Sequence, residues 1–140
     1  MNNLRLGSPK MMDVAVTANM RQGLAQEQIA HRGWAYSAEQ AMTLIGGRDV
    51  VDLREKCERE RHGEILGALH LPYHDLRENL SPNGILHMRA AVPVRTLLFY
   101  CAFGERSAMA VQAAQDAGLR AARHIQGGIE AWRKAGGALA

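Results

Sequence analysis

Cysteine is scarce in this 140-residue chain, which carries only Cys57 and Cys101. No Cys-x-x-Cys pair occurs, so the sequence offers neither the ligand spacing of a zinc ribbon nor the dithiol of a thioredoxin-type site. Two cysteines so far apart along the chain also do not make the disulfide framework of a small secreted domain. Cys57 lies inside a highly charged segment, where we expect it to be incidental.

Motifs for nucleotide and metal binding are also missing. The chain has no Walker loop and no Gly-x-Gly-x-x-Gly run, which leaves nucleotide binding unsupported. Among six histidines, His70 and His74 have the spacing of a metal-binding pair on a helix. Pro72 stands between them and is not compatible with a helix interior, so this pair does not fit a metal site. We expect no metal site and no cofactor.

Long apolar runs and a strong charge of one sign are lacking as well. No stretch reaches the roughly 20 apolar residues of a membrane helix, and the N-terminus lacks the apolar core of a secretory signal. The formal net charge is +3, and basic and acidic residues are mixed, as in segment 54–61. Such mixing is typical of a solvated helix face, so we expect neither nucleic acid nor a membrane as partner. The expected location is the reducing cytoplasm, which preserves a free thiol.

The residues that are present draw attention to one stretch, 96–117. Residues 96–100 are rich in apolar and aromatic types and lead into Cys101. A short loop with Gly104 follows, and residues 107–117 have strong helix propensity. The pattern predicts a buried strand, a tight turn and a helix, with Cys101 at the carboxyl end of the strand, where open α/β sheets place their sites. The loop amides would point inward and form an anion-binding cradle around the thiol.

Such a cradle would make Cys101 reactive. The helix dipole, the loop amides and the Arg106 guanidinium all favour the thiolate, which is the nucleophilic form. A lone cysteine at the end of a core strand is more often buried and inert. Here Gly104, Arg106 and the switch from strand to helix favour the reactive interpretation.

Helices and strands are predicted to alternate along the rest of the chain. This alternation is typical of an α/β fold with a mostly parallel central sheet and helices on both faces. Ser37 and Gln40 have the form of a capping box at the start of a helix. The predicted helices cover residues 37–45, 55–62, 75–80 and 129–135, the predicted strands cover 50–53, 68–71 and 121–125, and 85–95 are ambiguous apart from an extended stretch near Pro93.

The first 33 residues are predicted to form a helical N-terminal extension, and residues 34–140 the domain itself. Val16, Met20 and Leu24 recur at helical spacing and form one apolar stripe. A stripe of this kind has to be buried, either on the same domain or on another subunit. The sequence therefore leaves open whether the protein is a monomer or a homodimer.

Three parts of the chain together resemble the rhodanese family of sulfurtransferases. The resemblance extends over about residues 35–137 and departs from the family at Glu64, where histidine is common. Residues 101–107 (Cys-Ala-Phe-Gly-Glu-Arg-Ser) are similar to the active-site loop of that family, 50–55 and 63–72 to its first sequence block, and 126–136 to its last.

The resemblance implies a rhodanese-like fold and a two-step transfer of sulfane sulfur. The Cys101 thiolate would take the outer sulfur from a small anionic donor such as thiosulfate, or from a protein persulfide, and a thiol or cyanide would then accept it. Asp52 and Arg54 would be supporting scaffold residues near the site. The substrate-binding loop would comprise Ala102, Phe103, Gly104, Glu105, Arg106 and Ser107, with Arg106 binding the donor or bracing the loop.

Two other functions stay open on the sequence. Cysteine phosphatases also hold a thiolate in an amide cradle that ends in arginine, but they have five residues between the two. Four residues separate Cys101 from Arg106, and the shorter ring leaves less room for a tetrahedral phosphate. The second alternative is a persulfide carrier or protein-interaction module that keeps the fold without turnover.

Overall fold

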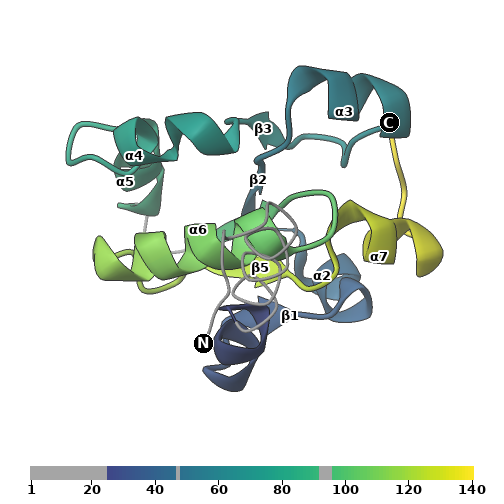
Figure 1. Ribbon diagram of the computed structural model, residues 1–140, viewed down its shortest axis with the longest axis horizontal. Helices are drawn as coiled ribbons and strands as arrows, with labels where there is room; N and C mark the ends of the chain where they lie inside the picture. Colours follow the sequence, from purple (N-terminus) through teal and green to yellow (C-terminus); the bar gives the residue numbers. More distant parts are fainter. Residues whose placement is uncertain (1–24, 47, 92–95) are drawn as a thin grey trace, which may run out of the picture.

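The computed structural model describes residues 25–46, 48–91 and 96–140. Within these residues, a sheet of five strands forms the centre of the molecule, in the order β1-β5-β4-β2-β3 (Figure 1). Every neighbouring pair is parallel. The strands are β1 (Ala35–Tyr36), β2 (Arg48–Asp52), β3 (Leu69–His70), β4 (Thr96–Tyr100) and β5 (Arg123–Ile125).

Helices cover both faces of this sheet, so the predicted α/β class is confirmed. Because side chains alternate along a strand, β4 serves two cores. Leu97 and Phe99 pack with residues of α4 (Leu76–Asn79), α5 (Ile85–Ala90) and α6 (Glu105–Asp116), whereas Leu98 and Tyr100 pack with residues of α2 (Ala38–Leu44) and α7 (Gly128–Lys134). The other described helices are residues 25–31, α3 (Lys56–His62) and the 3-10 turn η1 (Tyr73–Asp75).

Two elements go beyond the sequence prediction. β1 was not predicted, because two residues are too few to show a periodic pattern; it exists through its pairing with β5, where Ala35 lies opposite His124. α5 occupies the first part of the ambiguous segment, with Leu86 fully buried. The extended stretch predicted near Pro93 lies outside the described residues.

The described residues include only the end of the predicted N-terminal helix. Residues 25–31 are helical, and Ile29 is buried in the same cluster as Phe99 of β4 and Val111 of α6. The stripe of Val16, Met20 and Leu24 lies outside the described residues, and the domain boundary at residue 33 stays a prediction.

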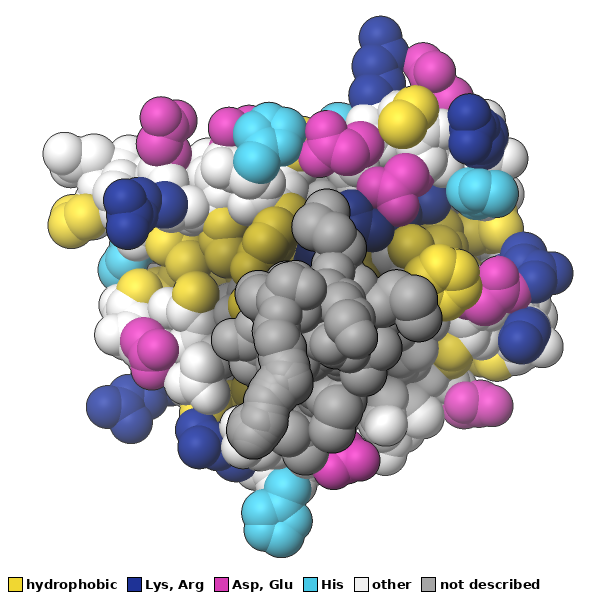
Figure 2. All heavy atoms as spheres, in the orientation of Figure 1, with side chains coloured by type: hydrophobic (Ala, Val, Ile, Leu, Met, Phe, Trp, Pro, Cys, Tyr) yellow, Lys and Arg dark blue, Asp and Glu magenta, His cyan; other side chains and the backbone are white. Residues whose placement is uncertain are grey.

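Charge is mixed over the surface, but one charged helix does more than face solvent. On the face shown in Figure 2, basic and acidic side chains of the described residues are interspersed. The prediction of a solvated salt-bridged face for segment 54–61 is correct for the exposed Lys56–Glu60 pair. It is wrong for Arg54, which is fully buried, and for Glu58 and Arg59, which pair with Arg106 and Asp52, because this side of the segment faces the loop and the end of β2. Across the described ranges, no helix combines the length and the apolar character that crossing a bilayer requires.

Candidate active site

Cys101 directly follows β4, and its sulfur lies inside a ring of hydrogen-bond donors. The backbone N–H of Gly104 donates to Cys101 Sγ at 3.1 Å and that of Ser107 at 3.4 Å. Ser107 Oγ lies 3.6 Å from the same sulfur. Both Cys101 and Ser107 are fully buried. Backbone donors aimed at one sulfur stabilise negative charge there, as the predicted cradle requires.

The start of α7 holds the loop in this orientation. Ile129 N–H donates to the Cys101 carbonyl at 2.9 Å, and Glu130 N–H donates to the Ala102 carbonyl at 3.2 Å. The first N–H groups of a helix have no partner within the helix. In α7 these groups fix the loop carbonyls on the outside of the ring, which leaves the loop amides free to face the sulfur.

Gly104 is required where the loop turns into α6. Its φ of +104° lies in the left-handed region that disfavours other residues. A Cβ at this position would lie 2.6 Å from Gln26 Oε1 and 3.0 Å from the Gly127 nitrogen. The loop therefore passes tightly between residues 25–31 and the start of α7.

Arg106 braces the loop through a two-pronged ion pair with α3. Its guanidinium donates to both carboxylate oxygens of Glu58 at 2.8 Å. These hydrogen bonds lower the pKa of Glu58 to about 2 and raise the pKa of Arg106. The sequence left two roles for Arg106, and this pairing favours bracing over donor binding, because the fork of the guanidinium is already occupied.

A buried network supports the site below the loop. Asp52, at the end of β2, accepts from Arg54 Nε at 3.0 Å and Nη2 at 2.9 Å, and from the Arg54 backbone N–H at 3.0 Å. Asp52 also accepts from Arg59 Nε at 3.1 Å, and the Tyr100 hydroxyl donates to Asp52 at 2.7 Å. Burial opposes ionisation of Asp52, but the hydrogen bonds from Arg54 and Tyr100 outweigh it and hold the pKa of Asp52 below its usual value. Since Tyr100 precedes Cys101, this network fixes the end of β4 to β2.

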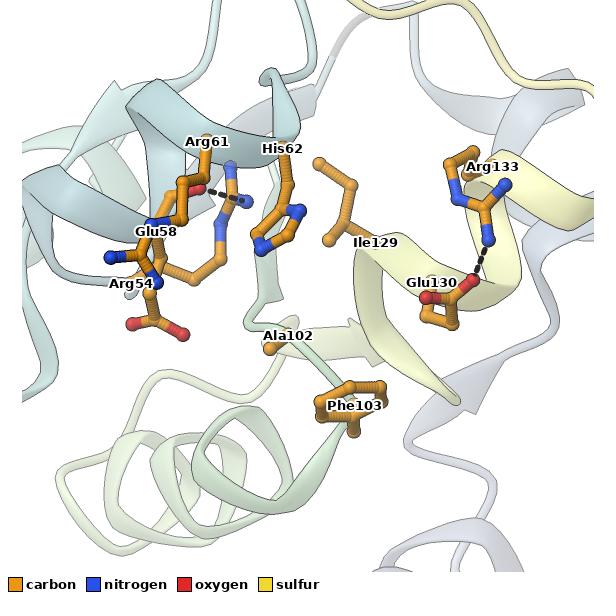
Figure 3. Close-up of a pocket in the computed structure, with 9 residues that line it drawn as sticks. All are labelled: Arg54, Glu58, Arg61, His62, Ala102, Phe103, Ile129, Glu130 and Arg133. Carbon is orange, nitrogen blue, oxygen red and sulfur yellow. Dashed lines mark hydrogen bonds and ion pairs between the residues drawn. The ribbon is translucent and has the colours of Figure 1, made fainter.

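A cavity of about 380 Å³ opens beside the loop, between α3 and α7 (Figure 3). Ala102 and Phe103 line it on the loop side, and Phe103 is 58% exposed. Glu58, Arg61 and His62 line it from α3, and Ile129, Glu130 and Arg133 from α7. Apolar side chains and charged side chains of both signs line this cavity, which suits a small polar substrate or a side chain from another protein.

The structure brings together most of the residues that the sequence singled out, and adds others. Ala102, Gly104 and Ser107 shape the ring, Phe103 lies at the cavity, and Glu105 opens α6. Cys57, by contrast, is exposed on α3. The described residues contain no group of three histidine, cysteine or acidic side chains that could hold a metal ion. Sequence reasoning missed Glu58, Tyr100 and His124, whose contacts with the site join positions distant along the chain.

A comparison with known families identifies this arrangement. The family model for the rhodanese-like domain matches residues 37–135. The mouse thiosulfate sulfurtransferase/rhodanese-like domain-containing protein 3 is 28% identical over 97 residues, which are 64% of this chain and 62% of that protein. The chain thus spans less than two thirds of the length of this curated relative.

Solved structures share the fold of this chain. A protein of unknown function from Rhodopseudomonas palustris, described as a possible tyrosine phosphatase, is 30% identical and superposes with a TM-score of 0.74, covering 85% of this chain and 93% of its own. A human single-domain sulfurtransferase is 25% identical with a TM-score of 0.61, covering 72% of this chain and 96% of its own.

Proposed function

Because the chain belongs to the rhodanese-like domain family, we propose that it is a sulfurtransferase that carries sulfane sulfur on Cys101. The observation that carries this proposal is the pair of backbone donors, Gly104 N–H and Ser107 N–H, aimed at the Cys101 sulfur. Membership of this family supports sulfurtransferase-type activity in general. The donor, the acceptor and turnover itself are what we propose for this chain.

The reaction follows from a buried thiolate among fixed donors. The Cys101 thiolate attacks the outer sulfur of thiosulfate or of a persulfide; a new S–S bond forms at Cys101, and the S–S bond of the donor breaks with sulfite or a thiolate as leaving group. An acceptor thiolate or cyanide then attacks the outer sulfur of the Cys101 persulfide and releases the Cys101 thiolate. No electron is gained or lost overall, and the backbone donors stabilise negative charge at each stage.

The first prediction tests this assignment at Cys101. After treatment with thiosulfate and desalting, the intact protein is expected to gain one sulfur atom, and Cys101→Ser is expected to lose both this added mass and all thiosulfate–cyanide turnover. Cys57→Ser is the matched control, because Cys57 is exposed whereas Cys101 is buried. It should behave as the parent protein.

The same experiment separates the alternatives. A persulfide on Cys101 without turnover of any thiol or cyanide acceptor would show a carrier. Hydrolysis of a phosphate monoester without persulfide formation would show a phosphatase and contradict the proposal. The spacing of four residues between Cys101 and Arg106 supports sulfur transfer over phosphatase chemistry, since the ring is smaller than that of cysteine phosphatases.

A second prediction concerns donor choice and Glu105. Glu105 is the first residue of α6, beside the ring. Its negative carboxylate repels a doubly negative donor such as thiosulfate. Two like charges about 6 Å apart interact by roughly 3 kcal/mol at an effective dielectric constant near 20, and solvent reduces this severalfold. Glu105→Gln is therefore expected to lower the KM for thiosulfate by up to about tenfold at low salt, with little change in kcat.

Glu60→Gln on α3 is the control for a general change in charge, because Glu60 pairs only at the surface with Lys56. Equal thiosulfate kinetics for Glu105→Gln and the parent at both low and high ionic strength would contradict the effect. If the prediction holds, a less negative donor such as a protein persulfide is favoured.

A further inference from the structure

His124, on β5, is buried beneath the loop and belongs to none of the roles described above. It is fully inaccessible to solvent and lies opposite Phe99 of β4 in the sheet. Its Nδ1 atom lies 2.8 Å from Ser107 Oγ, and its Nε2 atom is buried without a hydrogen-bond partner among the described residues. A chain of two short steps therefore links His124 through Ser107 to the Cys101 sulfur.

Burial decides which form of the imidazole is present. The pKa of His124 is lowered to about 4 by burial, so the ring is neutral near pH 7 and carries a single N–H. With the proton on Nε2, a buried donor would have no acceptor. With the proton on Nδ1, this N–H donates to Ser107 Oγ, and only the Nε2 acceptor lacks a partner. A buried acceptor without a partner costs less free energy than a buried donor without one. The geometry therefore favours the Nδ1–H tautomer.

The tautomer fixes what Ser107 can do. When His124 Nδ1 donates, Ser107 Oγ accepts, and the hydroxyl proton stays available for another acceptor. Two acceptors lie in reach: Cys101 Sγ at 3.6 Å and the Gly104 carbonyl at 3.2 Å. The Gly104 carbonyl already accepts from Ala108 N–H at 3.0 Å. A thiolate at Cys101 carries full charge and is the stronger acceptor.

We propose that His124 is a positioning residue that donates from Nδ1 to Ser107 Oγ and so turns the Ser107 hydroxyl proton toward the Cys101 sulfur, adding a third donor to the ring. The inference deepens the proposed function, because it concerns the same nucleophile. In the opposite tautomer, Ser107 would give its proton to His124 and face the sulfur only as an acceptor, which favours the thiol over the thiolate.

The other ionisable groups near the sulfur are known and can be kept constant. Arg106 on α6 and Tyr73 in η1 are described ionisable groups that interact electrostatically with Cys101, and Glu58 on α3 binds Arg106. Glu105, the first residue of α6, interacts electrostatically with Arg106. All four stay in place in the variants below, so a change between variants reports on His124 and Ser107.

The test measures the rate of iodoacetamide alkylation of Cys101 against pH, in a Cys57→Ser background. His124→Leu is expected to move the midpoint of this curve up by about one pH unit, which is a roughly tenfold lower rate below the midpoint. His124→Asn, whose amide N–H₂ can take the place of Nδ1–H, is expected to stay within about threefold of the parent. In Ser107→Ala, which removes the hydroxyl, the further change His124→Leu is expected to add nothing.

Three results would overturn the proposal: an unchanged curve for His124→Leu, no rescue by His124→Asn, or an equal shift with and without the Ser107 hydroxyl. The last result would assign His124 a purely structural role. Alkylation needs no sulfur donor, so the outcome does not depend on whether the protein proves to be a sulfurtransferase.

A second measurement does not depend on the folding of any variant. In the parent protein, long-range ¹H–¹⁵N correlation spectra of the histidine rings should show Nδ1 of His124 as the protonated nitrogen and Nε2 as the unprotonated one at pH 7. Protonation on Nε2 would overturn the proposal.

Discussion

Gly128→Ala is expected to abolish sulfur transfer and to lower the free energy of unfolding by about 3–5 kcal/mol. Gly128 has φ of +66°, and a Cβ there would lie 2.6 Å from the Cys101 carbonyl oxygen and closer still to the Ala102 carbonyl. These two carbonyls are the ones that Ile129 and Glu130 hold outside the ring. Displacing them would rotate the loop amides away from the sulfur. Chemical denaturation and thiosulfate turnover measure the two effects.

Gly136→Ala is the matched control, at the other end of α7. Its φ of +88° carries similar backbone strain, but a Cβ there would meet nothing within 4 Å. It is expected to cost only the strain, about 1–2 kcal/mol, and to keep activity. Equal losses in the two variants would show that strain alone is responsible and that the approach of α7 to the loop does not matter. Full activity of Gly128→Ala would contradict the geometry altogether.

The loop with its flanking strand and helix, and the capping box, could be predicted because each depends on residues adjacent in sequence. An apolar segment followed by Cys101, Gly104 and a helix-forming segment predicts a strand, a turn and a helix. The structure has this strand and this helix as β4 and α6. The box of Ser37 and Gln40 is present, with each side chain bonded to the backbone of the other. Such patterns do not depend on what the segment packs against.

The bracing of the site could not be predicted, because it joins residues far apart in sequence. Glu58 and Arg106 are 48 positions apart, and nothing in a run of mixed charges marks which carboxylate turns inward. His124 also looks like an ordinary polar residue of the predicted strand 121–125 until the structure brings its ring within 2.8 Å of Ser107 Oγ. Glu64, the departure from the family pattern, pairs with Arg59 and exchanges backbone hydrogen bonds with Ala140, so local packing there is intact.

The network at Asp52 gives the second large effect: Asp52→Asn is expected to lower the free energy of unfolding by about 3–5 kcal/mol. The variant keeps the size of the side chain but removes the charge that faces Arg54 and Arg59. The N–H₂ group of the new amide would also face N–H donors of these arginines, where Asp52 has an acceptor oxygen. Arg54 is itself almost fully buried, so its charge would be left without a counter-ion. Glu60→Gln, at the exposed Lys56–Glu60 pair, should change stability by less than about 0.5 kcal/mol.

The dependence of this loss on pH identifies its cause. The pKa of Asp52 is lower in the folded protein than in the unfolded chain, so its ionisation contributes stability that is complete above about pH 4 and is lost as the pH falls through the folded-state value. The stabilities of Asp52→Asn and the parent should therefore differ most near neutral pH and converge in acid. A gap that stays constant down to pH 2 would assign the loss to packing. A gap that closes shows that the carboxylate charge, shared among Arg54, Arg59 and Tyr100, is what holds the end of β4 and its cysteine in place.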